Sequence, residues 1–588
     1  MTADDTPGAT GPRLRRIDFG GTASPAATTG PVTWAQQHML MLFDELHPQT
    51  DPLNLRFYTK VRPGLAEDEV LDALADLVRT HEALRTRYVA PPEGPAQRVS
   101  ATGHLDVPVF DCPAEAAETV ASQTLAALAS RPFDICREWP VRCAVVSVAG
   151  APRYLVFALC HLVVDFAGAA WMRDHLREVL PPQPGQGPAP ATAYRMASEA
   201  EWERSPAGVR SGERAVAHHE RTFSVMPQTM LPRPVAEPES PRYRYLEFHS
   251  PALAMALPVL AARHNTSAAT VVFAGVAAVS GFVAGLPGAF LQLTVGNRNK
   301  ARLHGAVGMF TQDVPAWVDL TDASVADIIG RSAPAVFQAG RFGIYPPAEL
   351  AAGRRRIESL RGVAFDLSCW LNYRTSTESA VPAAQPPPTE AELAQAAART
   401  RWRWLEGTDN STSTYFVFAD SRPRRLTLTT IVDTALLPAG EAVDWLRTVE
   451  RALCASVTRD VGVAEIAEST GLRQDARGGE WVLSDAGWVH VPSVADLVRR
   501  ASGSRQAAVF AEPSADGPRL VAYLDGGRSA ADPGGLHARC VAALPGVRTA
   551  AAPHEYVVCA GAPARVSDPA GWRDMPVLSR GSGRAALA

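Results

Sequence analysis

One histidine stands where a side chain can do chemistry. The apolar run Tyr154–Leu159 (YLVFAL) predicts a buried strand, Cys160 and His161 end it, and Ala167–Val179 predicts a helix that starts just past Asp165. A histidine between a strand end and a helix start is well placed to exchange protons with a substrate, and its usual pKa of about 6.5 suits that task. A single histidine also fits a structural role, so its neighbours must decide.

Cys160 directly precedes this histidine. Successive side chains on a strand point to opposite faces, so Cys160 and His161 are not expected to form the thiolate–imidazole pair of a cysteine protease. The eight cysteines of the chain show no CxxC pair and no metal-ligand spacing. The sequence therefore predicts reduced, mostly buried thiols and no metal site.

The segment Cys160–Asp165 (CHLVVD) has a histidine at its second position and an aspartate at its sixth. It resembles the HHxxxDG core motif of the condensation domains of nonribosomal peptide synthetases, with the second histidine and the aspartate of that motif in register. Other family motifs are matched in the same order along the chain, at Val32–Gln37, Val78–Tyr88 (RHExLRTxF), Arg131–Asp134 (PFDL), Gly296–Arg298 and Val307–Phe310, and more weakly at Phe342–Leu350, Leu371–Tyr373 and Thr427–Val457. The resemblance spans roughly residues 30–465 and indicates a free-standing condensation domain.

This resemblance implies an α/β fold of two chloramphenicol-acetyltransferase-like lobes in a V-shaped pseudo-dimer, with His161 at their junction. It also implies that an acyl group arrives on the phosphopantetheine of an acyl or peptidyl carrier protein supplied in trans. A small-molecule amine or hydroxyl is then the acceptor, and the sequence leaves open whether an amide or an ester forms. No cofactor bound by the protein itself is expected.

The resemblance also assigns site residues. His161 is the expected catalytic residue, and whether it acts as a base or orients the acceptor stays open. Asp165 and Arg298 are the expected ion pair that supports the site. Residues expected along the substrate channel are Cys160, Phe166, Gly168, Gly308, Gln312 and Asn372.

Three of these positions depart from the family pattern. Cys160 replaces the first histidine of the core motif, Phe166 stands where the motif has glycine, and Gln312 stands where a later motif has asparagine. The ring of Phe166 implies a narrowed or altered donor channel. Together the changes imply an unusual substrate or lost activity.

Composition excludes several classes of protein. A hydrophobic share of 46% with 20% charged residues is typical of a globular protein, and no apolar run is long enough to cross a bilayer. A net charge of −4 provides no general attraction for nucleic acid. Arg15 and Arg16 lack the apolar segment that follows them in an export signal. We expect a cytoplasmic protein with no nucleic-acid or membrane partner.

Proline-rich stretches divide the chain. Residues 181–190, 230–241 and 382–388 mark linkers or insertions, because proline interrupts helices and central strands. Between them, amphipathic helical patterns such as Leu65–Arg79 alternate with apolar runs such as Phe290–Val295. We expect a disordered lead-in at 1–30, an N-terminal lobe at 31–205, a C-terminal lobe at 206–465 and a small α+β block at 475–588.

The C-terminal block resembles the small C-terminal subdomain of adenylation domains. The similar segments are Val494–Arg500, Gln506–Phe510, Gly517–Leu524, Leu536–Pro545 and Tyr556–Val558. That subdomain normally ends in a lysine-bearing segment, whereas Gly581–Leu587 carries Arg584 and the block contains no lysine. Gly526–Ser529 predicts a turn. A degenerate block used for packing or for docking a partner is expected, without adenylation activity.

Three functions remain open at this point. The first is a condensation-type acyltransferase of natural-product biosynthesis. The second is a non-catalytic module that binds carrier proteins or recruits an enzyme. The third is an acyltransferase that uses coenzyme A thioesters directly. Retention of His161, Asp165 and Arg298 together favours the first, because a scaffold does not need the imidazole.

Overall fold

The chain forms two compact units, which we describe one at a time. Unit 1 contains Met1–Arg214, Gly296–Gln312 and Gly343–Pro347, and unit 2 contains Ala215–Val295, Asp313–Phe342 and Ala348–Ala588. The computed structural model describes residues 11–20, 27–89, 94–179, 194–299, 303, 305–375, 386–422, 425–504, 506–515, 517–526 and 532–584.

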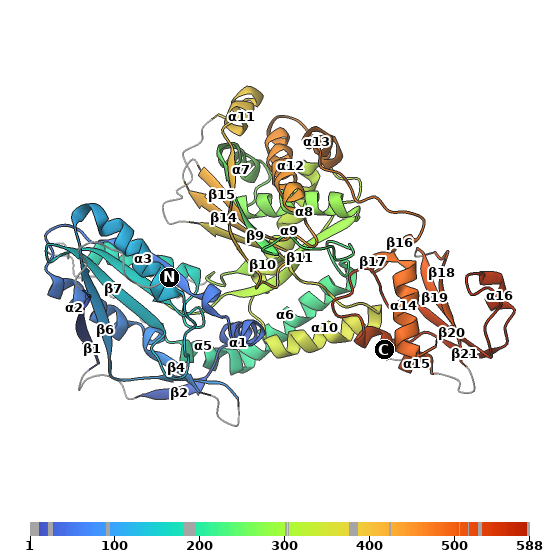
Figure 1. Ribbon diagram of the computed structural model, residues 1–588, viewed down its shortest axis with the longest axis horizontal. Coiled ribbons are helices and arrows are strands. Elements are labelled where there is room, and N and C mark those ends of the chain that lie inside the picture. The colour runs from blue at the N-terminus through green and yellow to red at the C-terminus, as the bar shows by residue number, and fades with distance from the viewer. Residues whose placement is uncertain are drawn as a thin grey trace. The chain divides into compact units, whose positions relative to one another are not determined.

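Unit 1 is built on a sheet with the strand order β1-β6-β7-β8-β3 (Figure 1). Its strands are β1 (Arg13–Phe19), β3 (Leu55–Lys60), β6 (Gly103–Asp111), β7 (Val141–Val148) and β8 (Ala151–Leu159). A smaller sheet has the order β2-β5-β4, with β2 (Thr28–Pro31), β4 (Thr86–Val89) and β5 (Ala96–Val99). The helices are α1 (Trp34–Leu46), α2 (Glu67–Thr80), α3 (Ala117–Ala129), α4 (Phe166–Val179) and α5 (Met196–Arg204), and α6 (Pro206–Val225) crosses into unit 2.

Helices cover both faces of the larger sheet in unit 1. Side chains of β8 alternate: Leu155 and Phe157 pack in the core that α1, α2 and α4 complete, whereas Tyr154 and Val156 pack with α3 on the other side. A strand covered on both faces is apolar throughout, which explains the continuous run that predicted β8. The predicted helix at Leu65–Arg79 is confirmed as α2, whose apolar stripe is buried.

The disordered lead-in expected for residues 1–30 is wrong for residues 13–19, which form β1, and for residues 28–30, which belong to β2. Arg13–Phe19 forms β1, an antiparallel edge strand paired with β6 from Arg13↔Val109 to Phe19↔Gly103. Ile17 and Phe19 are buried, and Arg15 pairs with Asp68 at the start of α2. The strand forms because a partner some ninety residues along the chain supplies its hydrogen bonds, which no local pattern reveals.

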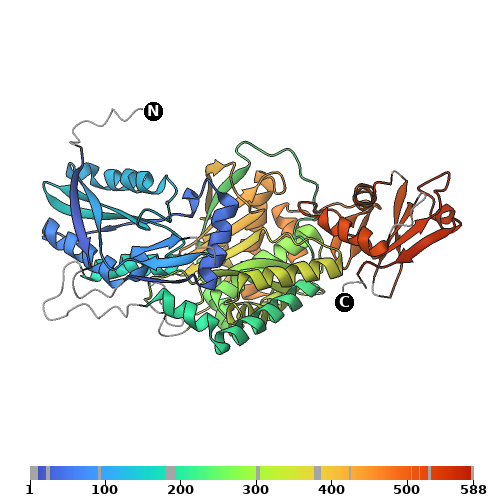
Figure 2. The ribbon, with the colours of Figure 1, turned by 90° about the horizontal axis from the view of Figure 1, so that it is seen from below.

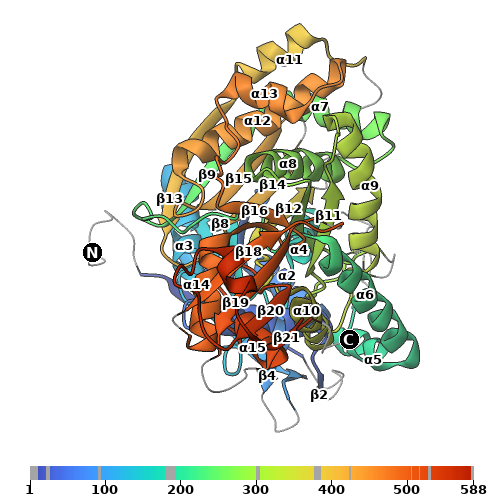
Figure 3. The ribbon, with the colours of Figure 1, turned by 90° about the vertical axis from the view of Figure 1, so that its right-hand side faces the viewer.

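Unit 2 contains a mixed sheet with the strand order β11-β10-β12-β14-β15-β9-β13. The strands are β9 (Tyr243–Ser250), β10 (Gly288–Val295), β11 (Gln312–Asp319), β12 (Cys369–Thr375), β13 (Arg401–Thr408), β14 (Tyr415–Arg422) and β15 (Arg425–Asp433). Helices α7 (Pro251–Arg263), α8 (Ala268–Ala284) and α12 (Ala439–Thr458) pack together on this sheet (Figure 3). The predicted strand at Phe290–Val295 is confirmed as β10.

Further helices surround this core: α9 (Val325–Arg341), α10 (Pro347–Arg361), α11 (Glu390–Ala397) and α13 (Val463–Thr470). Figure 2 shows α6 and α10 side by side, where Arg356 pairs with Glu220. The stretch 230–241 forms neither helix nor strand, as its prolines predict. Residues 181–190, 382–385 and 527–529, which carry other predicted linkers and the turn, lie outside the described residues.

The C-terminal block lies in unit 2. It contains β16 (Trp481–Ser484) paired with β17 (Gly487–His490), and a sheet with the order β18-β19-β20-β21. That sheet is formed by β18 (Ala507–Glu512), β19 (Arg519–Asp525), β20 (Glu555–Cys559) and β21 (Val577–Gly581), with α14 (Val491–Ser502), α15 (Pro533–Ala542) and α16 (Pro569–Arg573). The segments that suggested an adenylation-type subdomain fall on α14, β18, β19, α15 and β20, so the block contains the helices and strands expected of a small α+β block.

In the described part of the chain, no single helix is long and apolar enough to cross a membrane. Of the helices that the structure describes, only α7 and α8 taken together, bent by 105°, reach the required length and composition.

Candidate active site

His161 lies in a turn that connects β8 to α4, in unit 1. Its Nδ1 is 3.0 Å from the carbonyl oxygen of Val164. A carbonyl oxygen only accepts hydrogen bonds, so in the neutral ring Nδ1 carries the proton and Nε2 is the basic nitrogen. The turn itself is closed by the Val163 amide, which donates to the carbonyl of Cys160 at 3.1 Å. The backbone therefore fixes the orientation and the tautomer of the imidazole.

Asp165 anchors the far end of this turn. The side chain is 1% exposed, and its Oδ1 accepts from Arg298 Nη2 at 2.7 Å and from the Gly168 amide at 2.8 Å. Its Oδ2 accepts from the Phe310 amide at 3.3 Å. A buried carboxylate is stable only when such donors compensate its charge. The ion pair expected between Asp165 and Arg298 is present within unit 1.

Arg298 joins several pieces of backbone at once. Its Nη1 donates to the carbonyls of Leu303 at 2.9 Å and Ala306 at 2.8 Å. Its guanidinium carbon lies 4.7 Å from the centroid of the Phe310 ring, within range of a cation–π contact. Since Gly308 O also accepts from the Asp165 amide at 3.0 Å, the segment Gly296–Gln312 is tied to the turn that carries His161.

A side chain at either of the two expected glycines would crowd its neighbours. A Cβ on Gly168 would lie 3.2 Å from Val164 Cγ1 and 3.3 Å from Arg298 Nη2, which crowds the ion pair. A Cβ on Gly308 would lie 2.5 Å from Met196 Sδ and 2.7 Å from the Phe310 ring. Both glycines therefore allow segments to approach the His161 turn.

A buried series of hydrogen bonds, from Gln36 through Tyr88, supports the turn that carries His161. Both residues belong to the sequence motifs, but the motifs did not reveal this role. The Tyr88 hydroxyl donates to the Leu162 carbonyl at 3.1 Å and accepts from Gln36 Nε2 at 2.9 Å. Burial raises the pKa of Tyr88 well above its usual value, so the hydroxyl keeps its proton. Gln36 belongs to the segment Val32–Gln37 and Tyr88 ends the segment Val78–Tyr88, so these two motifs meet at the His161 turn.

Cys160 lies in the core of unit 1 with no exposed surface. Burial raises the pKa of its thiol to about 12, so the thiol is protonated at neutral pH and is not a nucleophile. With Tyr88, Phe133 and Pro140 it borders only a small void. Cys160 therefore contributes to the packing of the core.

The other predicted channel residues occupy different surroundings. Phe166 is the first residue of α4 and is 38% exposed, so its ring stands at the surface of unit 1 near the His161 turn. Gln312 is 1% exposed, and its amide donates to the Tyr345 carbonyl at 2.9 Å and accepts from the Tyr345 amide at 3.3 Å. Asn372 is a half-buried residue of β12 in unit 2, opposite Phe418 of β14. Unit 1 thus holds every predicted site residue except Asn372.

This geometry presents one imidazole of defined tautomer on a rigid turn. A basic Nε2 can take a proton from an attacking amine or hydroxyl, or hold that group in position by a hydrogen bond. Asp165 is not positioned as the partner of the imidazole, because Nδ1 is engaged by Val164 and the carboxylate by Arg298, Gly168 and Phe310.

Comparison with known proteins identifies the class. The model of the condensation domain family matches residues 26–385. Phosphinothricin tripeptide synthetase PhsB of Streptomyces viridochromogenes is 29% identical over 310 residues, which cover 50% of this chain and 25% of that synthetase. The chain therefore spans about a quarter of the length of this relative.

Solved structures of condensation-type domains share the fold of this chain. The complex of the X-domain and OxyB from teicoplanin biosynthesis has a TM-score of 0.55 at 16% identity, covering 76% of this chain and 97% of that chain. The SgcC5 protein from Streptomyces globisporus has a TM-score of 0.55 at 17% identity, covering 73% and 99%. The chain belongs to the condensation domain family, and its two units carry the chloramphenicol-acetyltransferase-like fold of that family.

Proposed function

We propose that this protein is a condensation-type acyltransferase of natural-product biosynthesis. Its donor is an acyl thioester on the phosphopantetheine of a carrier protein, and its acceptor is an amine or a hydroxyl. The observation that carries the proposal is the fixed tautomer of His161, with Nδ1 on the Val164 carbonyl and Nε2 basic.

The reaction follows from that basic nitrogen. The acceptor nitrogen or oxygen attacks the thioester carbonyl carbon, so a C–N or C–O bond forms and the C–S bond breaks. Nε2 of His161 takes the proton from the acceptor and returns it to the departing thiolate, so the imidazole ends neutral. Positioning the acceptor on Nε2 supplies rate even where the amine is already neutral. Asp165 and Arg298 act on structure, since they hold the turn and not the proton.

Single-turnover transfer tests the proposal. Carrier proteins loaded with a panel of acyl and aminoacyl groups are mixed with candidate amines and alcohols, and products are detected by mass spectrometry. We expect product with the native chain and a loss of about 10²-fold or more with His161→Ala, as for removal of a general base. His104→Ala, an exposed histidine of β6, is the matched control and retains full transfer.

The other functions give different results. Equal rates when the same acyl group is supplied on coenzyme A indicate an acyltransferase that needs no carrier protein. Unchanged transfer by His161→Ala removes the histidine from the mechanism. Binding of loaded carrier protein without transfer across the panel favours a recruitment module instead.

A further inference from the structure

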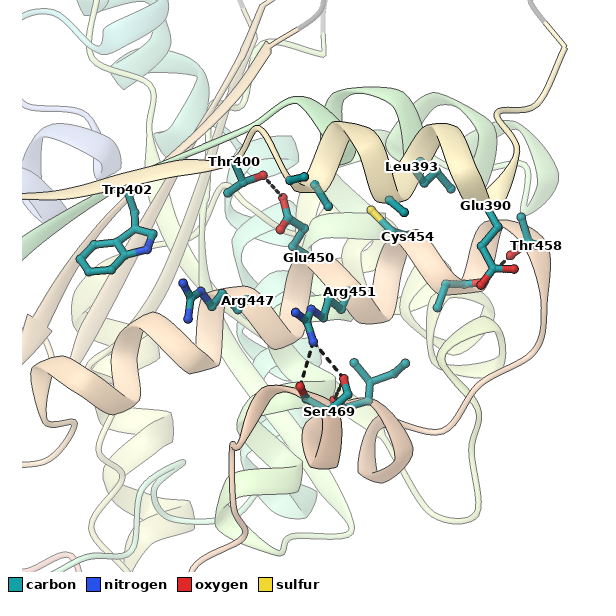
Figure 4. Close-up of a pocket in the computed structure, with 15 residues that line it drawn as sticks. Glu390, Leu393, Thr400, Trp402, Arg447, Glu450, Arg451, Cys454, Thr458 and Ser469 are labelled. Atoms are coloured by element: carbon teal, nitrogen blue, oxygen red, sulfur yellow. Dashed lines mark hydrogen bonds between the residues drawn. The ribbon is translucent and has the colours of Figure 1, made fainter.

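A cavity of about 670 Å³ lies among α11, α12 and α13, and all of its lining residues belong to unit 2 (Figure 4). Residues of α12 line the bottom of the cavity. Residues of α11 and the start of β13 line one side, and residues of α13 line the other. A cavity of this volume holds a small organic molecule. His161 is not among its residues, so the reaction centre does not account for it.

The cavity contains a buried carboxyl group. Glu450 is 4% exposed, and its Oε1 accepts from Thr400 Oγ1 at 2.6 Å and from the Ser250 hydroxyl. Among the described residues no donor reaches the second oxygen, Oε2. Burial raises the pKa of Glu450, while the hydrogen bonds from Ser250 and Thr400 and, to a smaller extent, the charges of Arg451 and Arg447 oppose that rise. A cationic or hydrogen-bonding group of a ligand is the natural complement of such a carboxyl.

Two arginines of the same helix provide the opposite charge. Arg451 is held in place because its Nη1 donates to Ser469 O at 2.9 Å and to Ser469 Oγ at 3.2 Å. Arg447 is 48% exposed, its Nη1 lies 3.6 Å from Asp444 Oδ1, and its guanidinium carbon lies 6.0 Å from the centroid of the Trp402 ring. Their remaining N–H groups suit a carboxylate.

Apolar residues make up much of the remaining lining, with Glu390 and Thr458 at its α11 end. Leu393 and Cys454 lie near one another between α11 and α12 in Figure 4, and Ala394, Ala397 and Ile466 complete the apolar part of the lining. The exposed Trp402 adds an aromatic face at the arginine end. A ligand that matches the cavity has an ammonium group, a carboxylate and an apolar side chain.

We propose that this cavity is a second binding site, which takes an α-amino acid or short peptide in its zwitterionic form. The ammonium group lies on Glu450, the carboxylate on Arg447 and Arg451, and the side chain against Leu393, Cys454 and Trp402. The site is independent of the transfer reaction proposed for His161.

Calorimetric titration of the full chain tests this site. The probes are L-phenylalanine and the dipeptide L-phenylalanyl-L-alanine. The probe that binds more tightly shows whether the site prefers an amino acid or a peptide. N-acetyl-L-phenylalanine removes the ammonium group and L-phenylalanine amide removes the carboxylate. We expect each blocked compound to bind at least tenfold more weakly than the zwitterion.

Two variants test whether binding takes place in this cavity. Glu450→Gln keeps an oxygen that accepts from Ser250 and Thr400 but removes the negative charge of the carboxylate. Arg447→Ala removes an exposed side chain and so leaves the core undisturbed. Each variant is expected to weaken the binding of L-phenylalanine at least tenfold. Two controls should bind it normally: Arg459→Ala, which changes an exposed arginine just past α12, and His161→Ala. Absence of binding by both zwitterions up to about 10 mM, binding that survives both Glu450→Gln and Arg447→Ala, or binding lost in His161→Ala each overturns the proposal.

Discussion

Asp165 shows how a single residue determines whether the site is assembled. Its carboxylate is buried and accepts from Arg298 and from two backbone amides, so Asp165→Asn leaves the Arg298 guanidinium with a missing counter-charge inside the protein. Breaking one half of a buried ion pair costs about 3–5 kcal/mol. We expect a loss of that size in the free energy of unfolding, measured in urea.

A double-mutant cycle separates the pair from its surroundings. Arg298→Met alone removes the donors to Leu303 and Ala306 as well as the ion pair. If the two groups act as a pair, Asp165→Asn costs much less in the Arg298→Met background than in the native chain. Equal costs in both backgrounds would contradict the assigned role.

Glu203 gives unit 1 a dependence on pH. It is 2% exposed on α5 and accepts from the Trp34 amide at 2.8 Å, and burial raises its pKa from 4.5 to about 8. The stabilisation by the protonated carboxyl is therefore complete below about pH 4.5 and is lost as the pH rises to about 8. Within this window the free energy of unfolding should fall by at most about 1.4 kcal/mol per pH unit from this group.

Urea unfolding between pH 5 and 9 checks this dependence. Glu203→Gln retains an acceptor for Trp34 and should flatten the slope. The matched variant Glu201→Gln changes an exposed residue of the same helix and should leave the slope as it is. An identical slope in the native chain and Glu203→Gln would exclude Glu203 as its source.

At the scale of elements, the buried contact between β4 and the His161 turn positions the imidazole. Tyr88→Phe leaves the Leu162 carbonyl and Gln36 Nε2 without the hydroxyl, and unpaired buried groups cost about 1–3 kcal/mol each. We expect lower stability together with slower transfer in the carrier-protein assay. Tyr154→Phe, which removes a hydroxyl that donates to Glu118 at 3.4 Å and does not contact the His161 turn, is the control and should affect neither strongly. Full activity in Tyr88→Phe would show that the turn does not need this support.

Local pattern predicted the elements of the site but not the contacts between them. The apolar run before His161 and the stripe at Leu65–Arg79 predicted β8 and α2, because alternation and helical spacing are properties of a short segment. The chain Gln36–Tyr88–Leu162 joins residues more than fifty positions apart, so spacing alone cannot reveal it. Cys160 was expected on a channel wall, yet the direction of its side chain places the thiol in the core.

The whole molecule adds a block that the transfer reaction does not explain. Within unit 2, the Ala552 amide donates to the Gly362 carbonyl at 2.7 Å, and His537 Nε2 lies 2.7 Å from the Ser359 carbonyl. The resemblance to an adenylation-type subdomain predicted a separate C-terminal block, but its attachment depends on these long-range contacts. The block is fixed to the end of α10 and the loop before β12 by polar interactions.

Arg548 is the central residue of this attachment. It pairs with Asp366 in the loop before β12, and Asp366 also accepts from Thr229 at 2.7 Å. Arg548→Ala leaves a carboxylate that is only 17% exposed without its cation. We expect unfolding of unit 2 at lower urea and faster amide hydrogen exchange over residues 363–368 and the start of β12, which carries Asn372. Arg519→Ala removes an exposed arginine of the same block and should leave exchange in that loop unchanged. If Arg548→Ala also leaves the loop protected, the block is a passive attachment and the segment before Asn372 is held by unit 2 alone.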